Sequence, residues 1–237
     1  MNPYESVYRS GTAAELGVDR RAVFITRVYV HLTAALFAFA AVEVVLFKSG
    51  AAEGIMRAIS GTSWLLVLGA FMLTGWLASR AAHMSTSMGV QYAALGGFVL
   101  AEAIIFVPLL YVADRMAPGA ISSAAIVTYL GFAGLTAFVM ITRRDFSFLR
   151  GILVWGGILA LVAIVASVLF GANLGTWFSV AMVGFAGAAI LYDTSNVLHH
   201  YPEDRYVAAA LELFASVAMM FWYVLRLFIA SRDYLIC

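Results

Sequence analysis

The chain has 237 residues, of which 64% are hydrophobic and 11% charged. Soluble globular domains carry roughly 45–50% apolar and about 25% charged residues, so this composition excludes an ordinary soluble domain and indicates a membrane protein. The formal net charge of +1 offers no basic surface to phosphate backbones, and we expect no nucleic-acid partner. The single cysteine, Cys237, excludes an intramolecular disulfide and a cysteine-rich metal site.

Seven apolar stretches are long enough for transmembrane helices, which need about 20 mostly apolar residues. They are predicted at 22–47, 63–80, 87–113, 120–142, 150–170, 174–198 and 206–230. The runs are continuous and lack the alternation of a membrane β-strand, so the predicted fold class is an all-α integral membrane protein of about seven transmembrane helices. The segment 48–62 is expected to form a loop that includes a short interfacial helix.

The predicted organisation is a polar N-terminal arm (1–21), one seven-helix membrane domain (22–230) and a short C-terminal tail (231–237). Lys and Arg are more frequent on the side that holds the N-terminus and the loops after the second, fourth and sixth spans. The positive-inside rule then predicts a cytoplasmic N-terminus, and an odd number of spans places the C-terminus outside. We expect a bacterial inner membrane, because the sequence shows neither a long soluble tail nor an endoplasmic-reticulum retention signal.

Ionisable side chains far from the interface are candidates for function, because charge in hydrocarbon is costly unless it is paired or hydrated. Asp193 lies well inside the sixth predicted span, and helical spacing places His200 on the same face, two turns nearer the cytoplasm. Such a face is suited to carrying protons or lining a cation path. In the alternative interpretation, Asp193 is held by an arginine or by hydroxyls and only locks helices together.

The last predicted span carries a polar stripe of Glu212, Ser216, Tyr223 and Arg226, whose spacings keep the four side chains on one helical face. We expect this stripe to face Asp193 across the bundle. The alternative is that Glu212 lies near the cytoplasmic interface and is simply solvated.

The third and first predicted spans also carry acids. Glu102 lies mid-span with Gln91 on the same helical face, and Pro108, six residues later, can kink the helix. A kink beside a buried acid indicates a cavity or a moving part; the alternative is a satisfied contact between helices. Glu43, close to Lys48, is expected to reach water at the outer interface. No phosphate-binding glycine loop, zinc-binding histidine pair or nucleophile elbow occurs, so we expect no enzyme, no catalytic residue and no cofactor.

Four segments of the sequence resemble the Bax inhibitor-1 family, also called the transmembrane Bax-inhibitor-motif family, in its bacterial form. They are Ile190-Leu191-Tyr192-Asp193-Thr194 followed by Ala209-Ala210-Leu211-Glu212-Leu213-Phe214, then Thr142-Arg143-Arg144-Asp145-Phe146-Ser147-Phe148-Leu149, and Arg27-Val28-Tyr29-Val30-His31-Leu32. The resemblance covers residues 20–230. It implies six helices around a central, less apolar seventh, and a pH-sensitive calcium leak.

In similar proteins two aspartates on the last two helices share a proton and gate the pore, with a nearby arginine as alternative partner. Asp193 matches the first aspartate, whereas the second falls on Ser216. Glu212, one turn earlier on the same face, is predicted to supply the missing carboxylate. Arg80, at the end of the second span, is the predicted charge partner of Asp193.

The sequence therefore predicts a cation leak, above all for calcium, with Asp193 as the protonatable gate and with Asp193 and Glu212 along a calcium path. The full predicted gate and ion path is Asp193, Glu212, Ser216, Arg80, Glu102 and His200. The alternative is a non-conducting regulator that binds another membrane protein, such as a membrane protease, through its polar arm. A proton-coupled transporter is the third interpretation, weakened by the lack of a visible inverted repeat.

Overall fold

The computed structural model describes residues 13–233, and within them the chain forms eight helices and no strand. The helices are α1 (Ala13–Lys48), α2 (Ala51–Ser60), α3 (Trp64–Met84), α4 (Met88–Met116), α5 (Ala120–Thr142), α6 (Leu149–Phe170), α7 (Gly175–His199) and α8 (Tyr206–Asp233). All but α2 are long and apolar enough to cross a membrane, which confirms the seven predicted spans. Helix α2 is the short helix expected between the first two spans.

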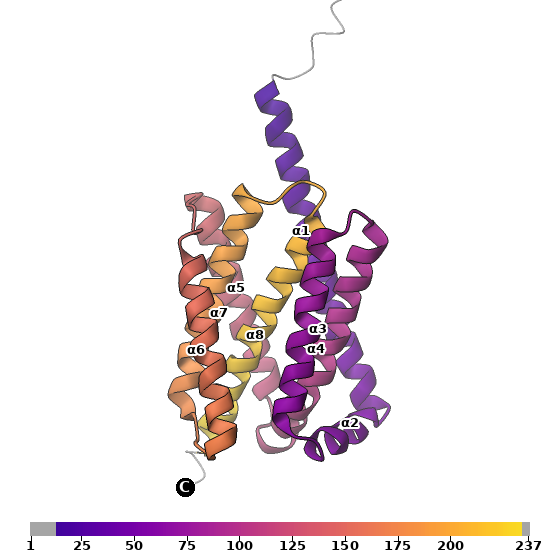
Figure 1. Cartoon of the computed structure of the whole chain (residues 1–237), viewed down its shortest axis with the longest axis vertical. Coiled ribbons are helices and arrows are strands. Elements are labelled where there is room, and N and C mark those ends of the chain that lie inside the picture. Colours follow the sequence, from indigo (N-terminus) through magenta and orange to yellow (C-terminus); the bar gives the residue numbers. More distant parts are fainter. Residues whose placement is uncertain (1–12, 234–237) are drawn as a thin grey trace, which may run out of the picture.

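Helix α8 occupies the interior of the bundle (Figure 1). It packs against α1, α3, α4, α5 and α7, and half of its span is buried, the largest share of any span. The prediction of a central last helix is confirmed, with one difference: α6 contacts α7 and α3 but not α8. The mean hydropathy of the α8 span lies below that of α1, α4, α5 and α6 but above that of α3 and α7.

Small side chains allow α8 to lie among so many helices. Ala208, Ala209 and Ala210 are at most 1% exposed, and side chains of this size let backbones approach closely in lipid. One turn further on, the ring of Phe214 is fully buried and lies 6.1 Å from the ring of Phe39 and 6.0 Å from that of Phe98. This aromatic contact joins α8 to α1 and α4.

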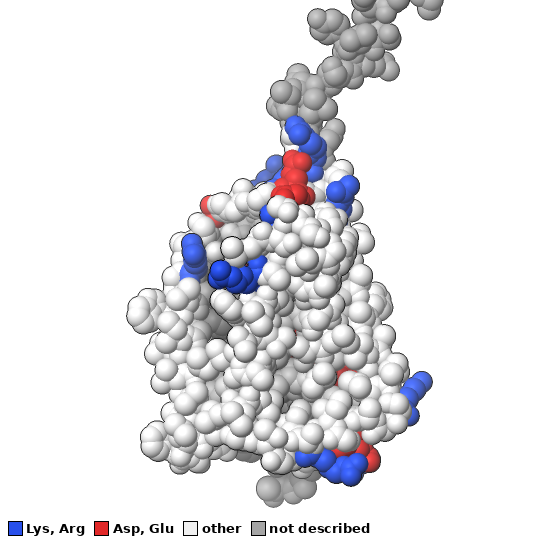
Figure 2. All heavy atoms as spheres, turned by 45° about the vertical axis from the view of Figure 1, so that its right-hand side comes forward, with Lys and Arg blue, Asp and Glu red and all other residues white. Residues whose placement is uncertain are grey.

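The two ends of the bundle differ in what they expose. Helix α1 extends beyond the bundle at the end that also holds the α7–α8 loop, here called the N-terminal face, and α2 lies at the opposite, C-terminal face (Figure 1). Since α1 begins at Ala13, part of the predicted arm is helical; residues 1–12 and 234–237 lie outside the described residues. Charged side chains gather at both ends, with few between them, as expected for a surface that contacts lipid (Figure 2).

The hairpin between α6 and α7 forms where the sequence predicts it. Gly171 and Gly175 adopt φ values of 66° and 64°, a left-handed conformation that side chains disfavour. Between them, the side-chain oxygen of Asn173 accepts a hydrogen bond of 3.0 Å from the Gly175 N–H. The hairpin is therefore closed by local chemistry and also borders the cavity described below.

Replacing Phe214 with Ala is expected to destabilise the folded chain by about 2 kcal/mol, less than in a soluble core because lipid also solvates a phenyl ring. The matched control is Phe37→Ala, since Phe37 is 72% exposed on the lipid-facing side of α1. Thermal unfolding of the detergent-solubilised protein measures both. An equal loss of melting temperature in the two variants would contradict the central packing of α8.

Candidate functional site

Asp193 on α7 is joined directly to Ser216 on α8. The Ser216 hydroxyl donates a hydrogen bond of 2.6 Å to Asp193 Oδ2, and Ser216 itself is 6% exposed. The structure therefore brings the two positions of the expected aspartate pair into contact, with a hydroxyl in place of one carboxyl. A serine hydroxyl stabilises the Asp193 carboxylate as a donor, but it has no acidic proton to share with it.

Glu212 has its own partners, on α3. The Ser79 hydroxyl donates to Glu212 Oε1 at 2.6 Å, and His83 Nδ1 lies 3.7 Å from the same oxygen. Asp193 and Glu212 lie close enough to interact electrostatically, but no hydrogen bond joins the two carboxyls. Glu212 thus lies near Asp193, but the two acids have separate hydroxyl donors, and the substitution of Glu212 for the second aspartate stays a prediction.

A histidine and a tyrosine lie beside Glu212 toward the N-terminal face. His83 Nδ1 donates to the Ser79 carbonyl at 2.8 Å, so in the neutral ring Nε2 accepts from the Tyr201 hydroxyl at 3.0 Å. Burial, followed by the negative charges of Glu212 and Asp193, raises the pKa of the Tyr201 phenol, which therefore stays protonated. Tyr201 belongs to the α7–α8 loop, so this loop is part of the site.

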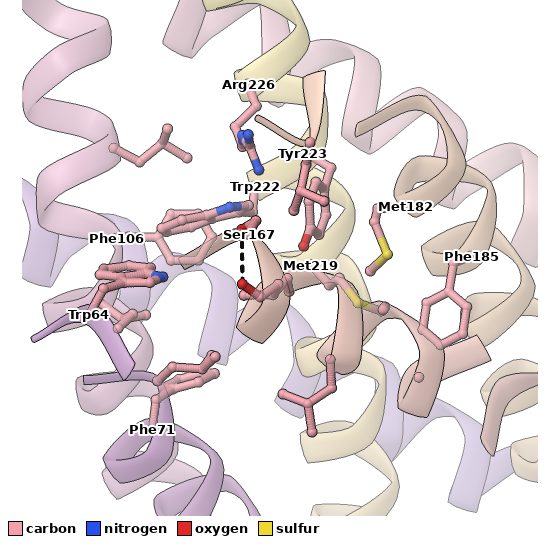
Figure 3. Close-up of a pocket in the computed structure, with 18 of the residues that line it drawn as sticks. Trp64, Phe71, Phe106, Ser167, Met182, Phe185, Met219, Trp222, Tyr223 and Arg226 are labelled. Atoms are coloured by element: carbon pink, nitrogen blue, oxygen red, sulfur yellow. Dashed lines mark hydrogen bonds between the residues drawn. The ribbon is translucent and has the colours of Figure 1, made fainter. Parts of the chain in front are cut away.

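A cavity of about 1010 Å³ extends along α8, between α3 and α4 on one side and α6 and α7 on the other. The predicted stripe of Glu212, Ser216, Tyr223 and Arg226 lines it, so the expected common face is confirmed. Glu102 lines the same cavity. Figure 3 shows Trp64, Phe71, Phe106 and Trp222 around the hollow, together with Tyr223 and Arg226. Asp193 is not among the lining residues and is reached from the cavity through Ser216.

Sequence reasoning gave no role in the site to three buried hydroxyls, one of which lies near Asp193. Tyr29, Thr136 and Thr194 come from α1, α5 and α7, and their buried oxygens form no hydrogen bond with any described residue. Tyr29 nevertheless lies near both threonines and near Asp193. Two of them have a sequence signal, because Thr194 follows Asp193 and Tyr29 lies in the segment 27–32 that resembles the family. Thr136 lies in an apolar run and has none.

Two predicted partners of Asp193 lie elsewhere. Arg80 is exposed, and its guanidinium lies 5.3 Å from the centre of the Trp76 ring, so the structure does not pair it with Asp193. His200 caps the C-terminal end of α7, where its Nε2 lies 3.5 Å from Asp145 Oδ2. Its observed partner is therefore Asp145, and the common face with Asp193 stays a prediction.

The other two acids are both deep in the bundle. Glu43 was expected to reach water, but it is 7% exposed and neither of its oxygens has a hydrogen-bond partner within residues 13–233. Glu102 is 6% exposed, as its mid-span position predicts. No group of three or more metal-ligating side chains gathers anywhere in residues 13–233, so the calcium path through Asp193 and Glu212 stays a prediction.

Asp145 joins the α5–α6 loop to the end of α7 at the N-terminal face. Its carboxylate accepts a 2.8 Å hydrogen bond from the Ser147 N–H, and Ser195 Oγ lies at 3.4 Å. Ser195 in turn accepts from the Phe146 N–H at 2.8 Å. The hydrogen bond from the Ser147 backbone, aided by His200, holds the pKa of the Asp145 carboxyl below its usual range. The loop is thereby fixed two residues from Asp193.

Comparison with known proteins places the chain among membrane proteins of one family. A family model described as "Inhibitor of apoptosis-promoting Bax1" matches residues 21–233. An uncharacterized protein of Pseudomonas aeruginosa is 38% identical over 48% of this chain and 51% of its own length. The Escherichia coli K12 "Modulator of FtsH protease YccA" is 34% identical over 45% of this chain and 49% of its own length. The same match in Escherichia coli O6:H1 is described as an inner membrane protein.

The chain spans about half the length of each of these bacterial relatives. A longer match is to "Bax inhibitor 1" of Schizosaccharomyces pombe, which is 26% identical over 95% of this chain and 84% of that protein. The predicted resemblance is confirmed over most of the sequence.

Asp145→Asn is expected to lower the melting temperature at neutral pH. Because the folded-state pKa lies below the unfolded value of about 3.9, ionised Asp145 stabilises the folded chain above that pH, and this stabilisation is lost as the pH falls through the folded-state value. The difference from wild type should therefore narrow below about pH 4. Asp114→Asn, at an exposed acid outside this network, is the control. If the difference in melting temperature between Asp145→Asn and wild type were equally large below about pH 4, the stabilising role of the ionised Asp145 carboxylate would be contradicted.

Proposed function

This chain belongs to the family of inhibitors of apoptosis-promoting Bax1, and we propose that it is a membrane-embedded regulator that binds another membrane protein. The observation that carries the proposal is the similarity to a protein described as a modulator of the FtsH protease. The proposed partner is accordingly a membrane-bound protease of that type. The inner membrane is the proposed location, with the N-terminal face in the cytoplasm, in accord with the greater number of Lys and Arg residues at that face.

The extension of α1 supports this proposal. It carries the chain beyond the bundle at the N-terminal face, where a partner can reach it (Figure 1). The extension is also linked to the rest of the protein: Arg21 donates to the carbonyls of Leu198 and Tyr201 at 2.9 and 2.7 Å. A partner bound at the extension would therefore act on the same loop that carries Tyr201.

A second function is proposed for the acid site, namely a pH-sensitive cation leak. It is favoured by the cavity, which reaches Glu212 and Ser216 within the bundle. Cations would gather near Glu212, and Asp193 would respond to protons through its contact with Ser216. With serine at this position the two-aspartate switch is incomplete, so Glu212 is the second acid of the proposed site.

Deletion of residues 1–20 tests the regulator. The variant keeps Arg21 and the seven spans, so we expect it to fold, but to bind a co-reconstituted FtsH-type protease at least about tenfold more weakly than the full chain. Binding is measured by titration in nanodiscs, and degradation of a membrane substrate by that protease is followed in the same preparation. A full chain that neither binds the protease nor changes its activity would overturn the proposal for this partner.

Calcium influx into dye-loaded liposomes tests the leak at about pH 6, 7 and 8, a range in which a buried carboxyl can titrate. We expect influx that depends on pH in the wild type and is lost or pH-blind in Asp193→Asn. Ser216→Asp should strengthen the pH dependence, because two adjacent carboxyls cannot both ionise cheaply. Glu43→Gln, a buried acid outside the cavity lining, is the control.

Influx no greater than in empty liposomes at every pH would contradict the leak. An unchanged pH response in Glu212→Gln would contradict the assignment of Glu212 as the second acid.

A further inference from the structure

Glu102 is a buried acid whose carboxyl has no protein partner. It is 6% exposed, it lines the large cavity, and no hydrogen bond or ion pair joins it to another described residue. A buried carboxyl in this situation gains from any cationic group that enters the cavity, because both charges are then taken out of water together. The Glu102 carboxyl is therefore available to bind a cationic ligand and does not serve a contact between helices.

The walls around Glu102 are aromatic. Phe98 and Phe106 precede and follow it by one helical turn on α4, and all three side chains line the cavity. Trp222 on α8 meets Phe106 edge to face, with ring centres 4.9 Å apart. Phe71 on α3 stacks on Phe98 at 6.1 Å. Figure 3 shows the rings of Phe71, Phe106, Trp64 and Trp222 arranged around one hollow.

An aromatic hollow with a carboxyl in its wall suits an organic cation better than a metal ion. Calcium takes 6–8 oxygen ligands, whereas around Glu102 the lining is mostly carbon, and the space of about 1010 Å³ is of the size that holds a small organic ligand. Ring faces attract a positively charged group most strongly when it is desolvated. The carboxyl and the rings therefore favour the same kind of ligand.

We propose that this cavity binds a lipophilic organic cation, a protonated amine or quaternary centre carrying apolar groups, with the charge at Glu102 and the apolar body against Phe71, Phe106 and Trp222. The site goes beyond both proposed functions and depends on neither. Tetraphenylphosphonium is the probe, since it combines one positive charge with four apolar rings.

Arg226 allows a test of whether the ligand carries a positive or a negative charge. It lines the same cavity toward the C-terminal face, and its guanidinium lies 5.9 Å from the centre of the Tyr223 ring. A cationic ligand is repelled by Arg226, whereas an anionic ligand is attracted to it. Neutralising Glu102 and neutralising Arg226 should therefore change the affinity for a cation in opposite directions.

The experiment is equilibrium dialysis of the purified full chain in detergent with tetraphenylphosphonium, run beside tetraphenylborate, an anion of matching shape. We expect saturable binding of the cation, a loss of at least about tenfold in Glu102→Gln, and tighter binding in Arg226→Gln. Glu43→Gln, which removes an equally buried acid outside the cavity lining, should bind like wild type. Phe106→Leu tests the aromatic wall and should weaken binding of the cation.

Three results would overturn the proposal: no saturable binding beyond that of empty micelles, equal losses in Glu102→Gln and Glu43→Gln, or stronger binding of the anion that disappears in Arg226→Gln. Melting curves of each variant establish that it is folded. If Glu102→Gln does not fold, Phe106→Leu and Arg226→Gln decide the question. Because the assay contains neither a protease nor an ion gradient, its outcome is independent of the regulator and the leak.

Discussion

Charge inside a bilayer is costly unless it is paired, hydrogen-bonded or hydrated, and two acids of this bundle are stabilised by hydroxyls that join α8 to its neighbours. Ser216 on α8 donates to Asp193 on α7, and Ser79 on α3 donates to Glu212 on α8. Each acid is thus held by a hydroxyl from a different helix. Because both contacts involve α8, this helix cannot turn its polar face toward lipid, and its alanine-rich first turns allow the close packing that the contacts need.

Much of this arrangement could be predicted from the sequence. Hydropathy and length locate the spans, and the spacing of Glu212, Ser216, Tyr223 and Arg226 places them on one face, as the cavity lining confirms. Both kinds of prediction rest on the regular geometry of long helices. In such a helix, the position of a residue in the sequence determines its depth along the helix axis and the face on which its side chain lies. For the same reason the mid-span position of Glu102 was a sound guide to its burial.

Contacts made by long side chains and by residues at helix ends could not be predicted in the same way. His200, the C-cap of α7, contacts Asp145, a residue in another loop. Arg80 lies over Trp76, its neighbour one turn back, rather than reaching across the bundle. Glu43 is buried although Lys48 marks an interface nearby, because α2 and α4 pack beside the end of α1. Contacts of this kind between distant segments produce no periodic residue pattern, so they cannot be predicted from a single sequence.

The α1 extension, where a partner is proposed to bind, is linked by contacts to the residues around Glu212. Arg21, at the base of the α1 extension, holds the backbone carbonyls of Leu198 and Tyr201, and the Tyr201 hydroxyl donates to His83 beside Glu212. A displacement of α1 therefore pulls on the loop whose tyrosine contacts the acid site. Coupling of this kind needs a differential contact in two states, and the Arg21 hydrogen bonds are the contacts that a bound partner would strengthen or break. A partner bound at the N-terminal face, as proposed, would thus act on the loop whose Tyr201 hydroxyl contacts His83 beside Glu212.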